Sequence, residues 1–111
     1  MENKIKKSVA TLLAHIIKVD NRDVEKEAPL FCRLMGEDFN CKEEEAKLFL
    51  KQIIAEDYNL DEHLTVINHA LSDNKLSKMH LLEQVNHIIY SDTIIPEDYK
   101  EFEKIKKALF S

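Results

Sequence analysis

Five carboxylates in two short stretches are the side chains of this sequence best suited to chemistry. Asp20, Asp23 and Glu27 lie in HIIKVDNRDVEKE, which spans His15 to Glu27, and Asp92 and Asp98 lie in HIIYSDTIIPED, which spans His87 to Asp98. Clusters of carboxylate oxygens suit hard divalent cations such as calcium and magnesium. The five residues are therefore candidate ligands of a divalent cation.

A structural role for the same carboxylates is the alternative. An Asp side chain can accept hydrogen bonds from backbone amides two or three residues further on, which fixes a corner between two helices. The calcium-binding EF-hand pattern fails: with Asp20 as the first ligand, Glu25 stands at its glycine position and Phe31 at its last glutamate position. The sequence leaves the cation site and the structural corner both open, because each requires the same carboxylates.

The two stretches form an internal repeat. In each copy an apolar helix ends at an Asp, an aliphatic residue follows, an acid stands three residues later, and a second helix begins; these residues are Asp20, Val24 and Glu27, then Asp92, Ile95 and Asp98. At about 100° per residue, Asp20 and Asp92 project within about 40° of the buried faces of their helices. We therefore expect both to point inward, at helix ends where the dipole disfavours a carboxylate. Backbone amides or a cation must offset that cost.

The elements that position these acids are predicted to be helices. One Gly and two Pro leave little material for hairpins, and the many Lys, Glu, Leu, Ile and Ala residues favour helix. Apolar residues at helical spacing predict helices over about 3–19 and 97–110 and four between them. We expect the second helix to have Pro29 in its first turn and to end at Gly36. We expect Asn40 and Glu43 to cap the start of the third helix and Ser77 to cap the start of the fifth. The prediction is an all-α, compact bundle of about six short helices, one domain over residues 1–111, with two pseudo-repeated units of helix, acid loop and helix.

Charge and hydropathy exclude several classes of function. The net charge is -5, with acids in excess between residues 21 and 62 and lysines at both ends. A nucleic-acid binder needs a broad basic face, so nucleic acid is not an expected partner. No apolar run approaches the roughly 20 residues that span a bilayer, and no signal peptide is recognisable. We expect a cytoplasmic protein.

Cys32 and Cys41 lack zinc-site spacing, and we expect one core thiol and one surface thiol.

The histidines and the single glycine argue against catalysis. We expect His15 and His87 at the rim of their helices, and none of the five histidines forms a chelating pair at i, i+4. No Ser or Cys lies in a known nucleophile motif, and one glycine cannot build a phosphate-binding loop. The prediction is a non-catalytic module, with a small metal-dependent hydrolase working through the paired carboxylates as the alternative.

The repeat also carries a family resemblance. The segments LLAHIIKVDNRDVEKE, at Leu12 to Glu27, and LLEQVNHIIYSDTIIPED, at Leu81 to Asp98, resemble the two Asp-Gly-containing repeats of the TerB-like family, which is named after bacterial tellurite resistance. The resemblance spans nearly the whole chain. It departs from the family where Asn21 and Thr93 replace the usual Gly. The family places an acid seven residues after the Asp; Glu27 matches this, whereas Tyr99 stands there in the second copy and Asp98 lies one residue earlier.

The resemblance implies a compact helical domain of the bacterial cytoplasm that acts in a stress response by binding. It leads us to expect protein partners, peripheral membrane association through those partners, and a divalent cation, calcium or magnesium, at the acidic turns. It implies no catalysis. A related helical domain, the DjlA type, precedes the J-domain of some DnaJ-like co-chaperones. This chain has no His-Pro-Asp triplet, so that motif gives it no J-domain activity.

Overall fold

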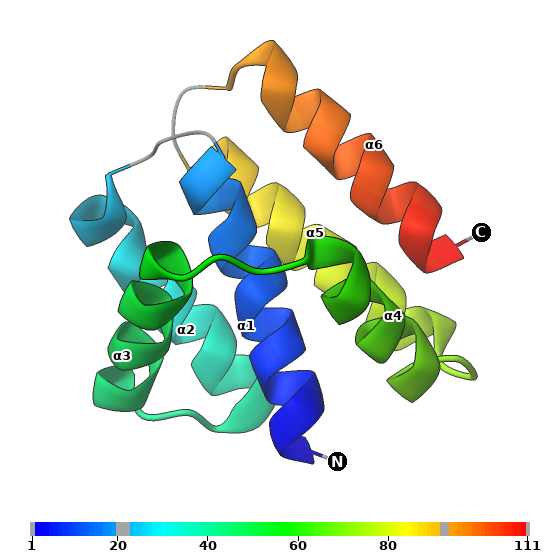
Figure 1. The fold of residues 1–111 in the computed structure, drawn as a ribbon, viewed down its shortest axis with the longest axis horizontal. Helices are drawn as coiled ribbons and strands as arrows, with labels where there is room; N and C mark the ends of the chain where they lie inside the picture. Colours follow the sequence, from blue (N-terminus) through cyan, green and yellow to red (C-terminus); the bar gives the residue numbers. More distant parts are fainter. Residues whose placement is uncertain (1, 20–22, 92–93, 111) are drawn as a thin grey trace.

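Six α-helices make up nearly all of the chain in a computed structural model, which describes residues 2–19, 23–91 and 94–110 (Figure 1). They are α1 (Glu2–Val19), α2 (Val24–Phe39), α3 (Glu43–Ala55), α4 (Leu60–Ala70), α5 (Lys75–Tyr90) and α6 (Pro96–Phe110). Within the described ranges there is no β-strand. The predicted all-α class with about six helices is confirmed.

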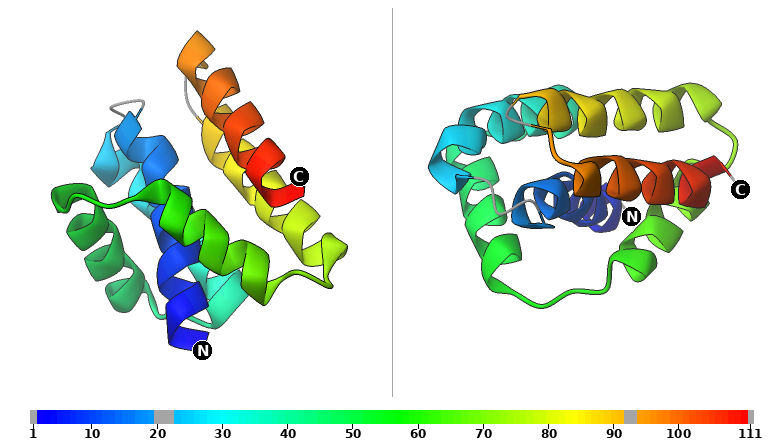
Figure 2. Two further views of the ribbon diagram at one scale, coloured as in Figure 1. Left: turned by 45° about the vertical axis from the view of Figure 1, so that its right-hand side comes forward. Right: turned by 90° about the horizontal axis from the view of Figure 1, so that it is seen from above.

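Helix α1 lies at the centre of the bundle and packs against α2, α3, α4 and α5. Figure 2 shows it enclosed when the molecule is seen from above. A surrounded helix needs apolar side chains on more than one face. Accordingly its buried residues run almost continuously, comprising Val9, Ala10, Leu12, Leu13, Ala14, Ile16 and Ile17. The repeated helix that carries the first acid stretch is therefore the one around which the core is built.

The remaining helices contribute narrower apolar stripes to the same core. Phe31 and Met35 of α2 and Ile88 of α5 are fully buried, as are Ile105 and Leu109 at the inner face of α6. Helix α6 packs against α5 and α4. The C-terminal ends of α1 and α5 lie at the same end of the bundle, so the first turns of α2 and α6 start there too (Figures 1 and 2).

The boundary between α2 and α3 differs from the prediction. Gly36 does not close α2; the helix continues to Phe39, and Asn40 takes the left-handed conformation at φ 54° and donates its backbone N–H to the Gly36 carbonyl. Asn40 is therefore the C-cap of α2 rather than the N-cap of α3. Helix α3 begins after Lys42, whose side chain makes no capping hydrogen bond. Asn tolerates the left-handed region well enough to end a helix without glycine.

Three smaller expectations were also wrong. Pro29 lies inside α2 instead of in its first turn. Helix α5 begins three residues earlier than expected, because Asn74 rather than Ser77 caps it, accepting a hydrogen bond from the Ser77 backbone amide at 3.0 Å. Cys41 is buried like Cys32, so neither thiol is a surface thiol. In the part of the chain that the structure describes, no helix is long and apolar enough to cross a membrane.

Candidate functional site

The first acid corner lies between α1 and α2, where Asp23 is the N-cap of α2. Its carboxylate accepts a hydrogen bond from the Glu25 backbone N–H at 3.0 Å, and its carbonyl accepts one from the Glu27 N–H at 3.0 Å. Such a cap satisfies amides that have no partner inside the helix, and the negative charge suits the positive end of the helix dipole. Asp23 is exposed and helps to hold the corner.

Glu27 is the buried acid of this corner. It is 2% exposed, and its Oε2 accepts a hydrogen bond from the Ser91 hydroxyl at 2.7 Å. Ser91 is the C-cap of α5 and stands at the other acid corner. The same hydroxyl oxygen lies 2.6 Å from the Ile88 carbonyl, so one proton serves two acceptors. The bond between Glu27 and Ser91 joins the two repeats directly.

Asp98 is the buried acid of the second corner. It is 3% exposed, and its Oδ2 accepts a hydrogen bond from the Ile95 backbone N–H at 2.9 Å. In return, the Asp98 N–H donates to the Ile95 carbonyl at 3.0 Å. This reciprocal pair resembles a capping box, and Pro96 follows at the first helical position, where its missing N–H costs nothing. Asp98 thus fixes the start of α6.

Two of the five predicted ligands, Asp20 and Asp92, lie outside the described residues, so the expectation that they point inward stays a prediction. The other three lie at the same end of the bundle, and the Ser91 hydroxyl links Glu27 to the second corner. Within residues 2–19, 23–91 and 94–110, no group of three or more His, Cys, Asp or Glu side chains is arranged to hold a metal ion.

A second polar cluster, on the side of α1, joins residues that are far apart in sequence. His15 Nδ1 lies 2.6 Å from the Tyr58 hydroxyl, and His15 Nε2 lies 3.0 Å from Glu101 Oε2. A carboxylate can only accept, so Nε2 carries the proton of the neutral ring and Nδ1 accepts from Tyr58. The three residues connect α1, the segment before α4, and α6. The rim position expected for His15 holds, since its side chain is 14% exposed.

Burial sets the protonation states in this cluster. It lowers the pKa of His15, while the Glu101 carboxylate acts in the opposite direction. Burial, with a smaller contribution from Glu101, raises the pKa of Tyr58 to about 12. Both rings therefore stay neutral at pH 7. Lys18 Nζ lies 4.9 Å from the centre of the Tyr58 ring, which is the geometry of a cation–π contact.

A Ser–His pair lies on the same face of α1. Ser8 Oγ is 3.0 Å from His63 Nδ1, and burial followed by the nearby Lys7 charge lowers the pKa of His63. The pair has the residue types of a nucleophile and a base. Ser8, however, is 1% exposed and stands inside a helix, where the surrounding backbone amides are engaged in helical hydrogen bonds and are not available as oxyanion-hole donors. The pair ties α1 to α4.

The repeat held a signal for the Ser91 contact that sequence reasoning missed. When HIIKVD is aligned with HIIYSD, Ser91 stands where the first copy has Val19. A hydroxyl in place of an apolar residue, next to a predicted acid loop, is a donor for a buried carboxylate. For Tyr58 and Glu101 the sequence holds no such signal, since they meet His15 across 43 and 86 residues.

No protein-family model, no curated protein and no solved structure matches this chain. The described residues form an all-helical bundle in which a hydrogen bond between Glu27 and Ser91 links the two acidic corners between helices.

Proposed function

We propose that this chain is a TerB-like helical binding module of the bacterial cytoplasm that acts in a stress response through protein partners. In this proposal it is non-catalytic, and its acidic corners hold a divalent cation, calcium or magnesium, with Asp20, Asp23, Glu27, Asp92 and Asp98 as the candidate ligands. The observation that carries the proposal is the hydrogen bond between Glu27 and Ser91, because it couples the two corners.

The burial of Glu27 supports the cation. A buried carboxylate is costly unless hydrogen bonds or a positive charge compensate it. Among the described residues, one donor reaches the Glu27 side chain, the Ser91 hydroxyl, and that hydroxyl also contacts the Ile88 carbonyl. A hard cation beside Glu27 would supply the missing compensation, and oxygen ligands are what calcium and magnesium prefer.

The coupling supports a role in recognition. A cation bound at the first corner would offset the negative charge of Glu27. It would thereby alter the hydrogen bond from the Ser91 hydroxyl at the end of α5. Partner surfaces near both corners would then respond to one binding event. The net charge of -5 favours partners with basic surfaces over nucleic acid.

Calorimetric titration of metal-stripped protein with calcium, magnesium and manganese tests this function. We expect binding with a Kd of about 100 μM or tighter, and stabilisation that follows mass action in parallel thermal melts. Asp20→Asn and Glu27→Gln should each reduce the affinity for the cation. Asp73→Asn is the matched control, because Asp73 is an exposed acid in the turn before α5.

The outcomes separate the alternatives. If no cation gives heat at millimolar concentration and Asp20→Asn lowers the melting temperature equally with and without metal, the corners are structural caps and the cation proposal is wrong. If metal-loaded protein turns over phosphoester or ester substrates and Asp20→Asn stops it, the chain is a small metal-dependent hydrolase instead of a binding module. Co-purification of a bacterial protein through the wild-type corners, lost in Glu27→Gln, supports the module.

A further inference from the structure

A cavity of about 190 Å³ opens between α1, α2 and α5, near the end of α2 that is remote from the acid corners. Its wall is apolar on one side, through residues such as Ile5, Val9 and Leu81, and polar on the other, through Asp38, Ser77, His80 and Gln84. Glu27 and Asp38 are eleven residues apart on α2, which is roughly 16 Å along the helix. The cavity is therefore separate from the site of the proposed function and does not depend on it.

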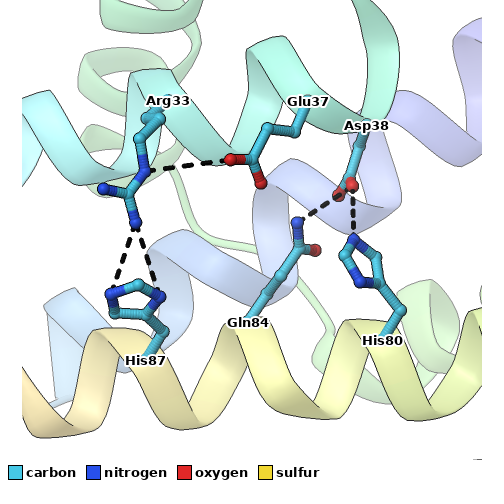
Figure 3. A network of polar contacts seen from close by, with 6 residues as sticks. All are labelled: Arg33, Glu37, Asp38, His80, Gln84 and His87. Atoms are coloured by element: carbon cyan, nitrogen blue, oxygen red, sulfur yellow. Dashed lines mark hydrogen bonds and ion pairs between the residues drawn. The ribbon is translucent and has the colours of Figure 1, made fainter.

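Gln84 lies in the wall of this cavity and carries a buried acceptor. The residue is 3% exposed, and its Nε2 donates to Asp38 Oδ1 at 2.9 Å (Figure 3). Its Oε1 is buried and accepts no hydrogen bond from the described residues. A buried acceptor without a donor is unfavourable, and native structures rarely retain one without a reason. The Gln84 side chain lines the cavity, while Oε1 itself has almost no accessible surface and lies behind the cavity wall.

Asp38 brings a carboxylate that lacks a full counter-charge. Among the residues that the structure describes, Gln84 and His80 hydrogen-bond to its side chain, and both bonds fall on Oδ1, with His80 Nε2 at 3.3 Å. The His80 side chain is 56% exposed. Burial raises the pKa of Asp38, and Gln84 and His80 oppose that shift only in part. Arg33, on the same helix, faces Glu37 and His87 instead.

We propose that this cavity binds a primary ammonium group on a short apolar stem. An ammonium has three N–H donors and no acceptor, which suits a wall that carries the Asp38 carboxylate and the Ser77 hydroxyl. The apolar side of the cavity takes the stem. A cavity of roughly 150 Å³ holds a benzene molecule, so this one has room for a ligand of about six non-hydrogen atoms. A linear alkylamine and the side chain of a lysine on another protein share this chemistry.

Titration of the full, ¹⁵N-labelled chain with n-pentylamine, followed by nuclear magnetic resonance, tests the proposal. The readout is the side-chain amide of Gln84 and the backbone amide of Ser77. We expect saturable shifts with a millimolar Kd, and affinity roughly tenfold weaker in Asp38→Asn, since one charge-assisted hydrogen bond is worth about that factor. Asp61→Asn, at an exposed acid on α4, is the matched control and should bind as the wild type does.

Two further ligands complete the experiment. n-Pentanol has the same stem without the charge, and we expect it to bind the wild type much more weakly than the amine does. The methylamide of N-acetyl-lysine distinguishes a lysine side chain from a free amine as the ligand. If it binds about as tightly as pentylamine, the ligand is a lysine of another protein; if it does not bind, the ligand is a free amine. Equal binding of pentanol and pentylamine to the wild type would overturn the proposal even if Asp38→Asn did not fold. So would the absence of saturable shifts at 50 mM amine.

Discussion

Replacing Tyr58 by Phe removes one hydroxyl from the cluster around His15 and leaves the ring in place. The hydroxyl lies 2.6 Å from His15 Nδ1, and its loss deprives a partly buried ring nitrogen of its donor. A hydrogen bond of this kind contributes about 1 kcal/mol net, and an acceptor left unsatisfied costs about 1–3 kcal/mol. Because the His15 side chain is 14% exposed, water reaches it in part, so we expect a loss of about 1–2 kcal/mol.

Urea denaturation at pH 7.5 measures this loss. With a slope of about 2 kcal/mol per molar urea, the midpoint should fall by about 0.5–1 M without a change in slope. In thermal melts the midpoint should fall by about 4 °C or more. Tyr90→Phe and Tyr99→Phe are matched controls, because these rings are 59% and 58% exposed, and we expect changes within about 0.5 kcal/mol.

The double-mutant cycle with Glu101→Gln decides whether the three residues act as one network. Glu101 is 3.0 Å from the other nitrogen of His15, so its charge and the Tyr58 hydroxyl act on the same ring. We expect a coupling energy of about 0.5 kcal/mol or more. A midpoint for Tyr58→Phe that coincides with those of Tyr90→Phe and Tyr99→Phe would refute the reasoning, since the buried contact would then contribute nothing beyond an exposed hydroxyl.

Three more predictions concern pH, a glycine and a cap. Burial lowers the pKa values of His15 and His63 in the folded chain, so the unfolded chain takes up protons first as pH falls below about 6.5. Stability should therefore decrease from pH 7.5 to 5.5, and less steeply in His15→Gln, as urea midpoints will record. Gly36→Ala should stabilise by about 0.5–1 kcal/mol, since the site is helical and an added Cβ lies 3.6 Å from the Cys41 carbonyl, an ordinary contact; a lower urea midpoint would contradict this. Asn74→Ala should cost about 1 kcal/mol and Asn74→Gly only a few tenths, because glycine is tolerated at an N-cap; equal losses in urea titration would count against the capping role.

The sequence predicted the helices well because their apolar periodicity is strong, and it predicted their ends less well. Gly36 was expected to end α2, yet Asn40 does so, and the pair Asn40 and Glu43 was expected to start α3. Both errors have one cause. Asn serves equally as an N-cap and as a left-handed C-cap, and only the position of the next helix decides between them. That position depends on the packing of α3 against α1 and α2, which local sequence does not encode.

The candidate sites were predicted only where their residues are neighbours in sequence. The acids of the two corners are local to their turns, so the repeat revealed them. The contacts of His15 with Tyr58 and Glu101, and those of Gln84 with Asp38, cross between helices, and they depend on how the helices cross. Helical angles placed His15 at a rim but could not show which side chains meet it there.

The two acid corners are not equivalent, and a shift of one residue explains the difference. In the repeat Val24 corresponds to Ile95, but α2 starts at Val24 whereas α6 starts one residue later, at Pro96. Asp98 therefore stands at the third helical position, where an acid reaches back to the amide of the cap residue, and it does so with Ile95. Glu27 stands at the fourth position, past the reach of that amide, and meets Ser91 instead.

This difference predicts unequal roles in the proposed function. The carboxylate of Asp98 is engaged in fixing the start of its own helix, so ligating a cation would compete with the cap. At the first corner Asp23 makes the cap, which leaves Glu27 to contact the other repeat. We therefore expect Glu27→Gln to reduce cation affinity with little effect on the melting temperature of metal-free protein. Asp98→Asn should do the reverse, and equal effects of the two substitutions on both quantities would argue against this division of roles.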